Sequence, residues 1–255
     1  MLTLHHKAFG QGDPVVILHG LFGTSDNWQT IGKQLADTFS VYLLDQRNHG
    51  RSPHATGLTY PLMAEDLQHF LESNWMYQTH LVGHSMGGKV AMQFALEYPD
   101  MLDKLVIVDI APKDYVGGHE LIFKALLALD LKSLKGRQQA DKQLQQLGIA
   151  SFGVRQFLLK NLTRNKTGGY AWKMNLFEIH KHYPDILKNI DSSGIFEGET
   201  LFIRGEASNY IQDDDWETIL QQFPNARLVT IPNAGHWVHA EAPKELLTHV
   251  TDFLA

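Results

Sequence analysis

A serine flanked by glycines is the first candidate for chemistry in this 255-residue sequence. Residues 83–87 read Gly-His-Ser-Met-Gly, directly after an apolar run that ends at Val82 and directly before a helical pattern that begins at Met86. A serine at such a tight strand-to-helix turn is held in a strained backbone conformation, and the glycines let neighbouring backbone approach. The pattern predicts that the Ser85 hydroxyl is exposed as a nucleophile.

A histidine has to activate this serine, because a serine hydroxyl is a weak nucleophile without a general base within hydrogen-bond reach. His236 is the best placed of the 14 histidines. It ends the run Asn-Ala-Gly-His at 233–236, which lies between the last predicted strand and the last predicted helix. His239 is the nearby competitor. We expect His236 to take the serine proton.

Two backbone N–H groups must also stabilise the oxyanion that forms when a serine attacks a carbonyl carbon. Met86 is expected to give the first, because it opens a helix whose N-terminal N–H groups lack partners and whose dipole is positive at that end. The second fits the run His-Gly-Leu-Phe-Gly at 19–23. We assign it to the Leu21 N–H, with Phe22 as the alternative.

A doubly wound parallel sheet would bring these residues to one edge. Six short apolar runs alternate with helical patterns, which is typical of an α/β fold whose sheet is covered on both faces. Leu2 and Leu4 alternate before a glycine-rich turn and predict an antiparallel edge strand. The runs span 15–18, 41–44, 80–82, 105–108, 201–203 and 228–231, and the helical patterns span 30–38, 61–73, 86–98, 216–223 and 243–254.

The alternation of strands and helices stops between residues 113 and 194. Helical patterns at 121–129, 152–162 and 183–190 dominate there, with one short apolar alternation at 170–176. We therefore expect a helical cap over the carboxyl edge of the sheet, where open α/β sheets bind ligands. The predicted units are an α/β core at 1–112 and 195–255 and a helical cap at 113–194.

Apolar side chains of the cap are expected to supply part of the substrate pocket, although most of them would form the core of the cap itself. The cap candidates are Phe123, Leu126, Leu127, Phe152, Phe157, Trp172, Met174 and Phe177. The residues that we expect to contact substrate are Phe22, His84, Trp172, Met174 and Trp237.

Four motifs that follow one another in the chain resemble the α/β-hydrolase superfamily. They are the runs at 19–23 and 83–87, the pair Gly235-His236, and Asp-Gln-Arg-Asn-His-Gly-Arg-Ser at 45–52, which we interpret as a structural loop. The runs at 21–28 and 172–176 resemble, more narrowly, small bacterial esterases of the YbfF type. The resemblance covers the whole chain. It implies the α/β-hydrolase fold with a cap, and hydrolysis of carboxylic esters or acyl thioesters, with acyl-CoA among the substrates and no cofactor.

The acidic partner of the histidine is where the sequence departs from the commonest pattern of that superfamily. Most members carry it after the penultimate strand in a Gly-Glu-X-Asp run, whereas this chain reads Gly-Glu-Ala-Ser-Asn at 205–209. Ser208 cannot carry the charge that stabilises an imidazolium, but Asp109, at the end of the strand after the nucleophile, can. We rank Asp109 first. Glu206 and the acidic run at 213–215 are the alternatives, although that run also fits a helix N-terminus.

The charges are unevenly distributed along the chain. The 22 Lys and Arg residues against 28 Asp and Glu residues give a net charge of −6, which argues against nucleic acid as a partner. Residues 113–194 carry 13 basic and 7 acidic residues, a net of +6, so the rest carries −12. A basic cap would attract anionic substrates such as the phosphates of coenzyme A. The competing interpretation is that these side chains only solvate helix faces.

Several kinds of site are excluded. The chain has no cysteine, which rules out disulfides, thiolate zinc sites and a cysteine nucleophile. His5 with His6, and His180 with His182, lack acidic and histidine partners at ligand spacing, so neither a metal site nor a cofactor is predicted. The sequence has no secretory signal and no apolar run of about 18 residues, which predicts a cytoplasmic protein without stable membrane insertion.

Two other classes of function share these features. Cofactor-free haloperoxidases, lactonases and carbon–carbon bond hydrolases use the same triad. A ligand-binding protein with vestigial hydrolase activity would keep the fold and lose part of the site, whereas here every part has a candidate. Serine at position 85 weighs against haloalkane dehalogenases and epoxide hydrolases, which use a carboxylate there. The predicted partner is therefore a small-molecule ester or acyl thioester.

Overall fold

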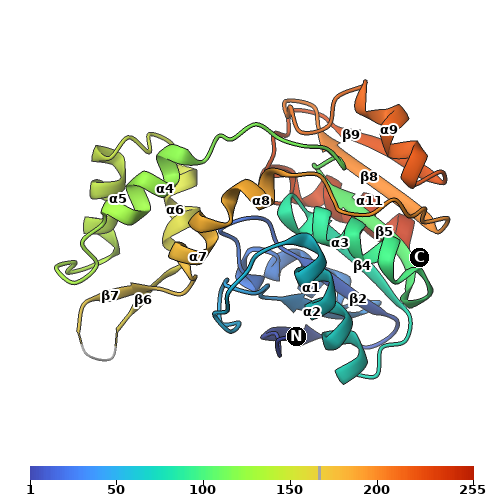
Figure 1. Cartoon of the computed structure of the whole chain (residues 1–255), viewed down its shortest axis with the longest axis horizontal. Helices are drawn as coiled ribbons and strands as arrows, with labels where there is room; N and C mark the ends of the chain where they lie inside the picture. Colours follow the sequence, from blue (N-terminus) through green and yellow to red (C-terminus); the bar gives the residue numbers. More distant parts are fainter. Residues whose placement is uncertain (166–167) are drawn as a thin grey trace.

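A seven-stranded sheet forms the centre of the computed structural model, which describes residues 1–165 and 168–255 (Figure 1). The strand order is β1-β3-β2-β4-β5-β8-β9. All neighbours are parallel except β1 and β3, so the carboxyl ends of the other strands share one edge. The strands are β1 (His6–Phe9), β2 (Pro14–Leu18), β3 (Ser40–Leu44), β4 (Thr79–His84), β5 (Leu102–Val108), β8 (Glu199–Gly205) and β9 (Ala226–Ile231).

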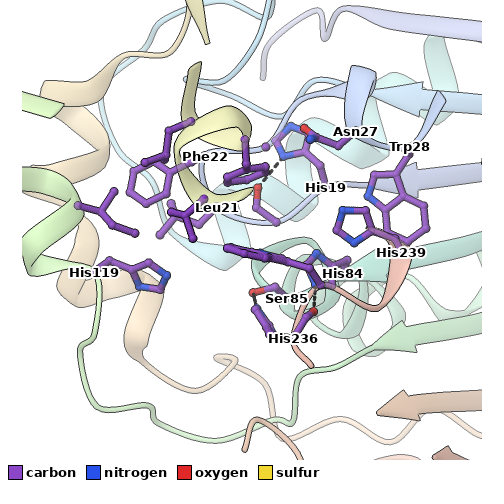
Figure 2. Close-up of a pocket in the computed structure, with 17 residues that line it drawn as sticks. His19, Leu21, Phe22, Asn27, Trp28, His84, Ser85, His119, His236 and His239 are labelled. Carbon is purple, nitrogen blue, oxygen red and sulfur yellow. Dashed lines mark hydrogen bonds between the residues drawn. The ribbon is translucent and has the colours of Figure 1, made fainter. Parts of the chain in front are cut away.

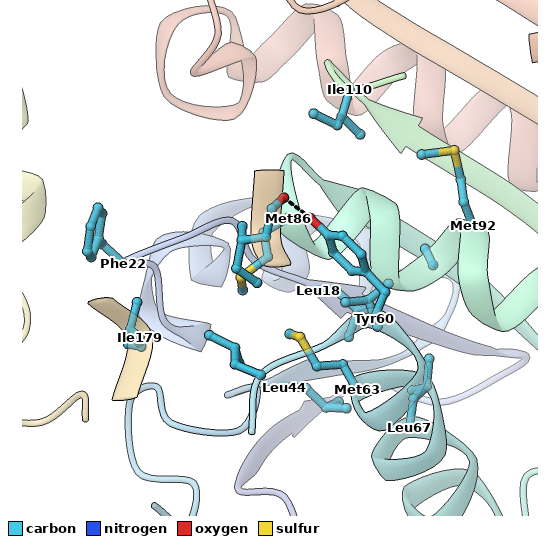
Figure 3. Close-up of a cluster of buried hydrophobic side chains, with 14 of the residues drawn as sticks. Leu18, Phe22, Leu44, Tyr60, Met63, Leu67, Met86, Met92, Ile110 and Ile179 are labelled. Atoms are coloured by element: carbon cyan, nitrogen blue, oxygen red, sulfur yellow. Dashed lines mark hydrogen bonds between the residues drawn. The ribbon is translucent and has the colours of Figure 1, made fainter. Parts of the chain in front are cut away.

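Helices cover both faces of the sheet, because successive side chains of a buried strand point to opposite faces. The first face packs against α2 (Tyr60–Ser73), α3 (Met86–Glu97) and α9 (Asp215–Gln222), and the second against α1 (Gln29–Leu35) and α11 (Pro243–Leu254). Val16 and Leu18 of β2 belong to the first apolar cluster, whereas Val15 and Ile17 belong to the second. Figure 3 shows part of the first cluster, which includes Leu18 and Tyr60.

The sequence predicted the elements outside residues 113–194 well, since each apolar run lies in a strand and each helical pattern overlaps a helix. The edge strand is an exception: it is β1 at His6–Phe9, not at Leu2 and Leu4. Leu4 is only 5% exposed, so the alternation there reflects burial in the core and not strand pairing. In the part of the chain that the structure describes, no helix combines the length and apolarity needed to cross a membrane.

Residues 113–194 form a mostly helical segment beside the sheet (Figure 1), except that 166 and 167 lie outside the described residues. The predicted alternation at 170–176 is a strand only over Tyr170–Trp172. Two helices were not predicted: α5 buries only two side chains, and α7 is short. The segment contains α4 (Glu120–Ala128), α5 (Arg137–Gln146), α6 (Phe152–Leu159), α7 (Leu176–Lys181), α8 (Tyr183–Leu187), and a ribbon of β6 (Leu162–Arg164) and β7 (Tyr170–Trp172).

Two side chains of α3 hold both connections between this segment and the sheet. Lys89 Nζ donates to the carbonyl oxygen of Lys113 at 2.7 Å and to that of Lys188. One turn later, Gln93 exchanges two hydrogen bonds with the backbone of Asp191, at 2.9 and 2.7 Å. Burial lowers the pKa of Lys89 to about 7. The entry and the exit of the segment are thus attached to one helix.

Candidate active site

Ser85 lies at a sharp turn between β4 and α3. Its φ of 52° and ψ of −122° are strained for a residue with a side chain. A Cβ on Gly83 would lie 2.4 Å from the Gly87 carbonyl oxygen, and a Cβ on Gly87 would lie 2.5 Å from the Leu18 carbonyl oxygen. Both glycines are therefore needed for the close backbone approach at this turn.

Three side chains form a hydrogen-bonded chain at the carboxyl edge of the sheet. Ser85 Oγ is 3.0 Å from His236 Nε2, and His236 Nδ1 is 2.8 Å from Asp109 Oδ2 (Figure 2 shows the first contact). Because a carboxylate only accepts, Nδ1 carries the proton and Nε2 is left to accept the serine proton. The three residues follow β4, β5 and β9. The structure therefore brings together the three residues that the sequence ranked first.

Asp109 is fully buried and has a positive φ of 54°. Its Oδ1 accepts the Gly205 N–H at 3.0 Å, and its Oδ2 accepts the Ser208 hydroxyl as well as the imidazole of His236. Three donors on one buried carboxylate fix its orientation toward the imidazole. Ser208, which cannot replace an aspartate as the acid, instead holds the aspartate in place.

The alternative acids have other partners. Glu206 accepts the Asn233 N–H at 3.0 Å, and Asp213 pairs with Arg204 at 2.6 Å. Asp215 begins α9, which fits the interpretation of the acidic run as a helix N-terminus. Within the described residues, none of these three carboxylates contacts the imidazole, so the geometry favours Asp109.

Two neighbours hold the ring of His236. Tyr210 stacks on it with ring centroids 3.6 Å apart, and His84 Nε2 donates to its carbonyl oxygen at 2.8 Å. Burial and the nearby histidines hold the pKa of His84 well below its usual range, so this residue, expected to contact substrate, is a neutral support for the base. The competitor His239 stacks on Trp28 at 4.8 Å, and burial lowers its pKa to about 3.

The two expected oxyanion donors border the same cavity as the serine, since Leu21, Ser85 and Met86 all line it. The Gly23 N–H donates to the Gly20 carbonyl at 2.9 Å and shapes the loop around Leu21. Neither the Leu21 nor the Met86 N–H donates a hydrogen bond within residues 1–165 and 168–255. Both are therefore free to bind a ligand oxygen.

Ser85 lies between two cavities, and Leu21 and His119 also line both of them. The free volume of the narrow cavity is about 40 Å³, and that of the wide cavity is about 360 Å³. Apolar walls of the narrow cavity include Phe22, Ile122, Val154, Phe157, Leu158 and Trp237. Tyrosines and a lysine line the wide cavity: Tyr60, Tyr115, Tyr183, Tyr210 and Lys89. Both cavities thus have mixed apolar and polar walls, and they differ mainly in size: one suits a small group and the other a larger one.

The substrate contacts predicted from the sequence divide into two groups. Phe22, His84 and Trp237 line the narrow cavity. Trp172 and Met174 line neither cavity, so the structure does not place these two at the site. Met174 is 2% exposed in the apolar core, and Trp172 pairs with Leu162 in the β6–β7 ribbon. Their alternation reflects packing inside the segment instead of a pocket wall.

Several residues at the site were missed from the sequence. Ser208 and Tyr210 belong to a polar loop in which nothing indicated which side chains would face Asp109 or the imidazole. His119 lies at the start of α4 and lines both cavities. Its only sequence signal is its position after two glycines near the start of the segment.

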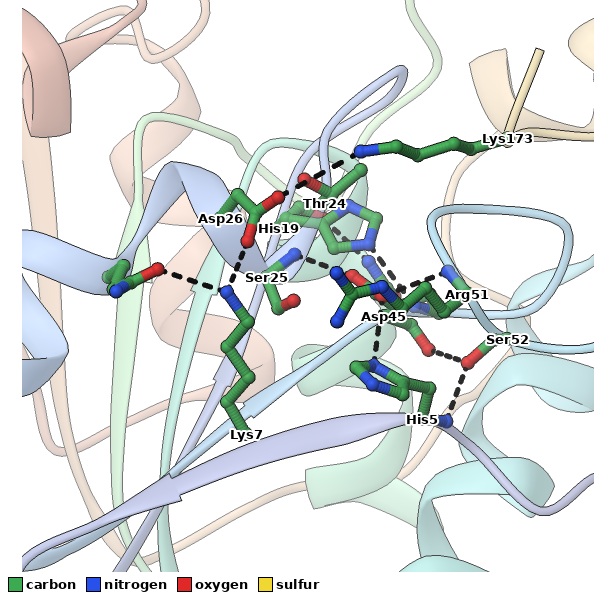
Figure 4. Close-up of polar contacts among 12 residues, drawn as sticks. His5, Lys7, His19, Thr24, Ser25, Asp26, Asp45, Arg51, Ser52 and Lys173 are labelled. Carbon is green, nitrogen blue, oxygen red and sulfur yellow. Dashed lines mark hydrogen bonds and ion pairs between the residues drawn. The ribbon is translucent and has the colours of Figure 1, made fainter. Parts of the chain in front are cut away.

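A second cluster of serine, histidine and aspartate lies at the end of β3 (Figure 4). Asp45 accepts the backbone N–H groups of Ser25 and Arg51 at 2.6 and 2.9 Å, and its Oδ2 is 3.1 Å from His5 Nδ1. Ser52 donates its hydroxyl to the Asp45 carbonyl oxygen. These bonds tie two loops to a strand end, as the structural interpretation of this motif expected.

Some histidines have acidic partners that the sequence analysis did not expect. His182 Nε2 lies 3.0 Å from Glu178 Oε1, and its Nδ1 lies 2.9 Å from Asp185 Oδ2. His182 lies between α7 and α8 and contacts one carboxylate on each of these helices. Within the described residues, no group of three or more such side chains has an arrangement suited to a metal ion.

Comparisons with known proteins point to one family. A family model described as alpha/beta hydrolase fold matches residues 13–243. The chain is 40% identical over 256 residues to a Danio rerio protein named sn-1-specific diacylglycerol lipase ABHD11, covering 96% of this chain and 80% of that protein. It is 37% identical to Esterase YbfF of Escherichia coli, covering 94% and 92%. A solved structure described as a marine microorganism esterase is 43% identical with a TM-score of 0.97, covering 99% and 100%.

Proposed function

The chain belongs to the α/β-hydrolase fold family and is an ester hydrolase, and we propose that it cleaves carboxylic esters through an acyl-enzyme on Ser85. The observation that carries the proposal is the continuous contact from Ser85 Oγ to His236 at 3.0 Å and from His236 to Asp109 at 2.8 Å. Relatives named esterase and diacylglycerol lipase support an ester as the substrate.

The reaction has two acyl-transfer steps. His236 Nε2 takes the Ser85 proton while Oγ attacks the ester carbonyl carbon, whose oxygen becomes an oxyanion bound by the N–H groups of Met86 and Leu21. The bond to the alkoxide oxygen then breaks, and His236 gives that oxygen the proton, so the alcohol leaves. Water repeats both steps on the acyl-enzyme and releases the carboxylic acid.

The surroundings of the imidazole suit these proton transfers. Asp109 keeps the proton on Nδ1 of His236 and stabilises the imidazolium that forms in each step. Ser208 and the Gly205 N–H hold the carboxylate, and the ring of Tyr210 supports the plane of the imidazole. The base therefore stays aligned with the serine through both steps.

We also propose that residues 113–194 act as a cap over the site. Side chains from this segment, including His119 and Phe157, line the cavities beside Ser85. An ester would lie across Ser85 with one arm in each cavity. The narrow cavity would accept a short arm, and the wide cavity would accept a larger one.

Acyl-CoA thioesters would follow the same chemistry, and the net charge of +6 over residues 113–194 favours them by attraction. However, Lys89 is the only lysine or arginine among the described residues that line the two cavities, and it already donates to backbone carbonyls. We therefore rank neutral esters above acyl-CoA. If the cap attracts anionic substrates, turnover of acyl-CoA should fall more steeply with salt than turnover of a neutral ester with the same acyl group. Equal salt responses of the two substrates would exclude this attraction.

Labelling with a fluorophosphonate, followed by peptide mass spectrometry, tests the proposed function. We expect the label on the peptide that contains Ser85 and no label on that peptide in the Ser85→Ala variant. Ser52→Ala is the matched control, because the Ser52 hydroxyl is committed to a backbone carbonyl, and it should label like the wild type. An unreactive Ser85 in folded protein would contradict the proposal and favour a ligand-binding role. A panel of esters with varied acyl and alcohol lengths then defines the substrate.

A further inference from the structure

His119 is the only titratable side chain among the described residues of 113–194 that lines both cavities beside Ser85. It is the N-cap residue of α4. Figure 2 shows its ring across the cavity from Ser85 and His236. A substrate that lies over the serine would therefore pass close to this ring.

The hydrogen bonds around Tyr183 determine which nitrogen of His119 carries a proton. The Tyr183 hydroxyl accepts the backbone N–H groups of Gly118 at 3.1 Å and of His119 at 3.2 Å, which occupies both of its lone pairs. Its own proton must then go to His119 Nδ1, which lies 2.8 Å away. Nδ1 is therefore an acceptor, and a neutral His119 carries its proton on Nε2.

Burial keeps both groups of this pair in the neutral form. Burial, together with the nearby His236, lowers the pKa of His119, and Glu120 opposes this only in part. Burial also raises the pKa of Tyr183, so its phenol keeps the proton that it donates. At neutral pH, His119 is therefore an Nε2–H donor.

The ring of His119 is held in place, but its Nε2–H has no acceptor within residues 1–165 and 168–255. Phe22 packs edge-on against the ring at a centroid distance of 5.9 Å, and Tyr183 does so at 5.6 Å. A donor that is fixed, largely buried and unpaired beside a ligand cavity recognises an acceptor on the ligand.

We infer that His119 is a specificity residue, which donates its Nε2–H to an oxygen that the ester substrate carries near the scissile bond. This inference rests on the proposed function. The substrates that it selects are esters with a hydroxyl, ether or second carbonyl oxygen in one arm, in place of a plain hydrocarbon arm. His119 does not compete with His236 as the base, because its Nε2 already holds a proton and its Nδ1 faces a phenol instead of a carboxylate.

Two pairs of esters of equal length test this inference. Butyl butanoate and 2-methoxyethyl butanoate differ only by an oxygen in place of a methylene in the alcohol arm. Butyl pentanoate and butyl 3-methoxypropanoate differ in the same way in the acyl arm. The measurement is the ratio of kcat/KM for the oxygen-bearing ester to that for its hydrocarbon partner, because a ratio cancels any general loss of active enzyme.

Three variants distinguish the effect of the Nε2–H donor of His119 from the effect of its ring. His119→Phe keeps an aromatic ring and removes the donor, and we expect the ratio for one pair to fall about ten- to hundredfold. Tyr183→Phe removes the bond that fixes the tautomer, and should lower the same ratio to a smaller extent. His180→Phe is the matched control, since His180 packs on Phe123 at 4.8 Å but lines neither cavity, and it should leave the ratio unchanged.

The outcomes distinguish the two proposals. If wild-type enzyme cleaves these esters and His119→Phe changes neither ratio, or His180→Phe changes it equally, the role of His119 is wrong and the proposed function stands. If wild-type enzyme cleaves none of the esters and Ser85 resists the fluorophosphonate, the proposed function itself fails. Fluorophosphonate labelling of His119→Phe shows whether the variant is folded, and Tyr183→Phe gives the answer if it is not.

Discussion

Two clusters of serine, histidine and aspartate lie at the same edge of the sheet, one around Ser85 and the other around Asp45. In the first cluster the serine, the histidine and the aspartate contact one another through their side chains, and the serine proton is directed to an imidazole nitrogen beside two cavities. In the second cluster, the carboxylate of Asp45 accepts hydrogen bonds from backbone N–H groups. The hydroxyl of Ser52 donates to a backbone carbonyl. The same residue types thus build the proposed reactive group in one place and a loop anchor in another. The destination of each proton makes the difference.

The largest effect that this comparison predicts is on turnover. Asp109→Asn should lower kcat by about 10⁴-fold, because the amide favours the wrong tautomer of His236. Asp45→Asn, the matching change in the second cluster, should keep most of the turnover of folded molecules and lose stability instead. Steady-state hydrolysis of a chromogenic ester, corrected by urea unfolding, checks both. Equal losses of kcat in the two variants would remove the distinction between the clusters.

The next effect is on stability, in the loop that follows Asp45. Arg47 is 5% exposed, and its Nε lies 2.6 Å from Asp66 Oδ2. Asp66→Ala leaves a buried guanidinium unpaired, so the free energy of unfolding should fall by about 3–5 kcal/mol in urea titrations. The double variant Arg47→Met, Asp66→Leu should recover most of that loss. A single variant as stable as the wild type would show that this pair is not an anchor.

Acid should lower the free energy of unfolding through both clusters to a similar extent, since a buried neutral histidine lies near each of them. Burial lowers the pKa of His49 and that of His239 to about 3. Below pH 6.5 the unfolded chain binds protons that the folded chain does not, so stability is complete above 6.5 and is lost as pH falls toward 3. Each histidine should cost about 1.4 kcal/mol per pH unit in that window.

Urea unfolding at pH 7.5, 6.5 and 5.5 measures this loss. His239→Phe keeps a ring against Trp28 and should make the dependence less steep by about 1.4 kcal/mol per pH unit, the share of one histidine. A His239→Phe variant with the wild-type dependence would contradict the assignment.

The smallest predicted effect comes from Ser208. Ser208→Ala removes one donor from the carboxylate of Asp109, which should lower kcat about tenfold and leave KM nearly unchanged. Ser208→Thr keeps a hydroxyl and should retain more turnover. If both variants match the wild type, the Gly205 N–H alone is enough to orient Asp109.

Local patterns predicted the parts of this molecule that depend on local geometry. The glycines around Ser85 report a close backbone approach, and the position of Asp109 at a strand end follows from the order of the apolar runs. Contacts between residues far apart in the sequence produce no such local pattern. Tyr210 meets His236 only because two loops converge, and no spacing in the sequence encodes that stacking.

The errors have the same physical origin. Apolar alternation indicates that a side chain is buried, but it does not distinguish the interior of a segment from the wall of a pocket. Trp172 and Met174 are in contact with the core of 113–194 for that reason, and Leu4 fills the main core where an edge strand was expected. His119 was missed because its proposed role depends on the tautomer that Tyr183 imposes on it.

The attachment of residues 113–194 to α3 has a consequence for how such a protein can diverge. Lys89 and Gln93 bind backbone atoms of Lys113, Lys188 and Asp191, and every amino acid supplies those carbonyl oxygens. The side chains of Lys113 and Lys188 can therefore change without loss of these hydrogen bonds to Lys89, provided that the path of the chain is kept. Deletion of the whole segment is different, because it would leave the buried ammonium of Lys89 in α3 without hydrogen-bond acceptors. The residue types at these attachment points can thus change, but removal of the segment would leave Lys89 without its carbonyl partners.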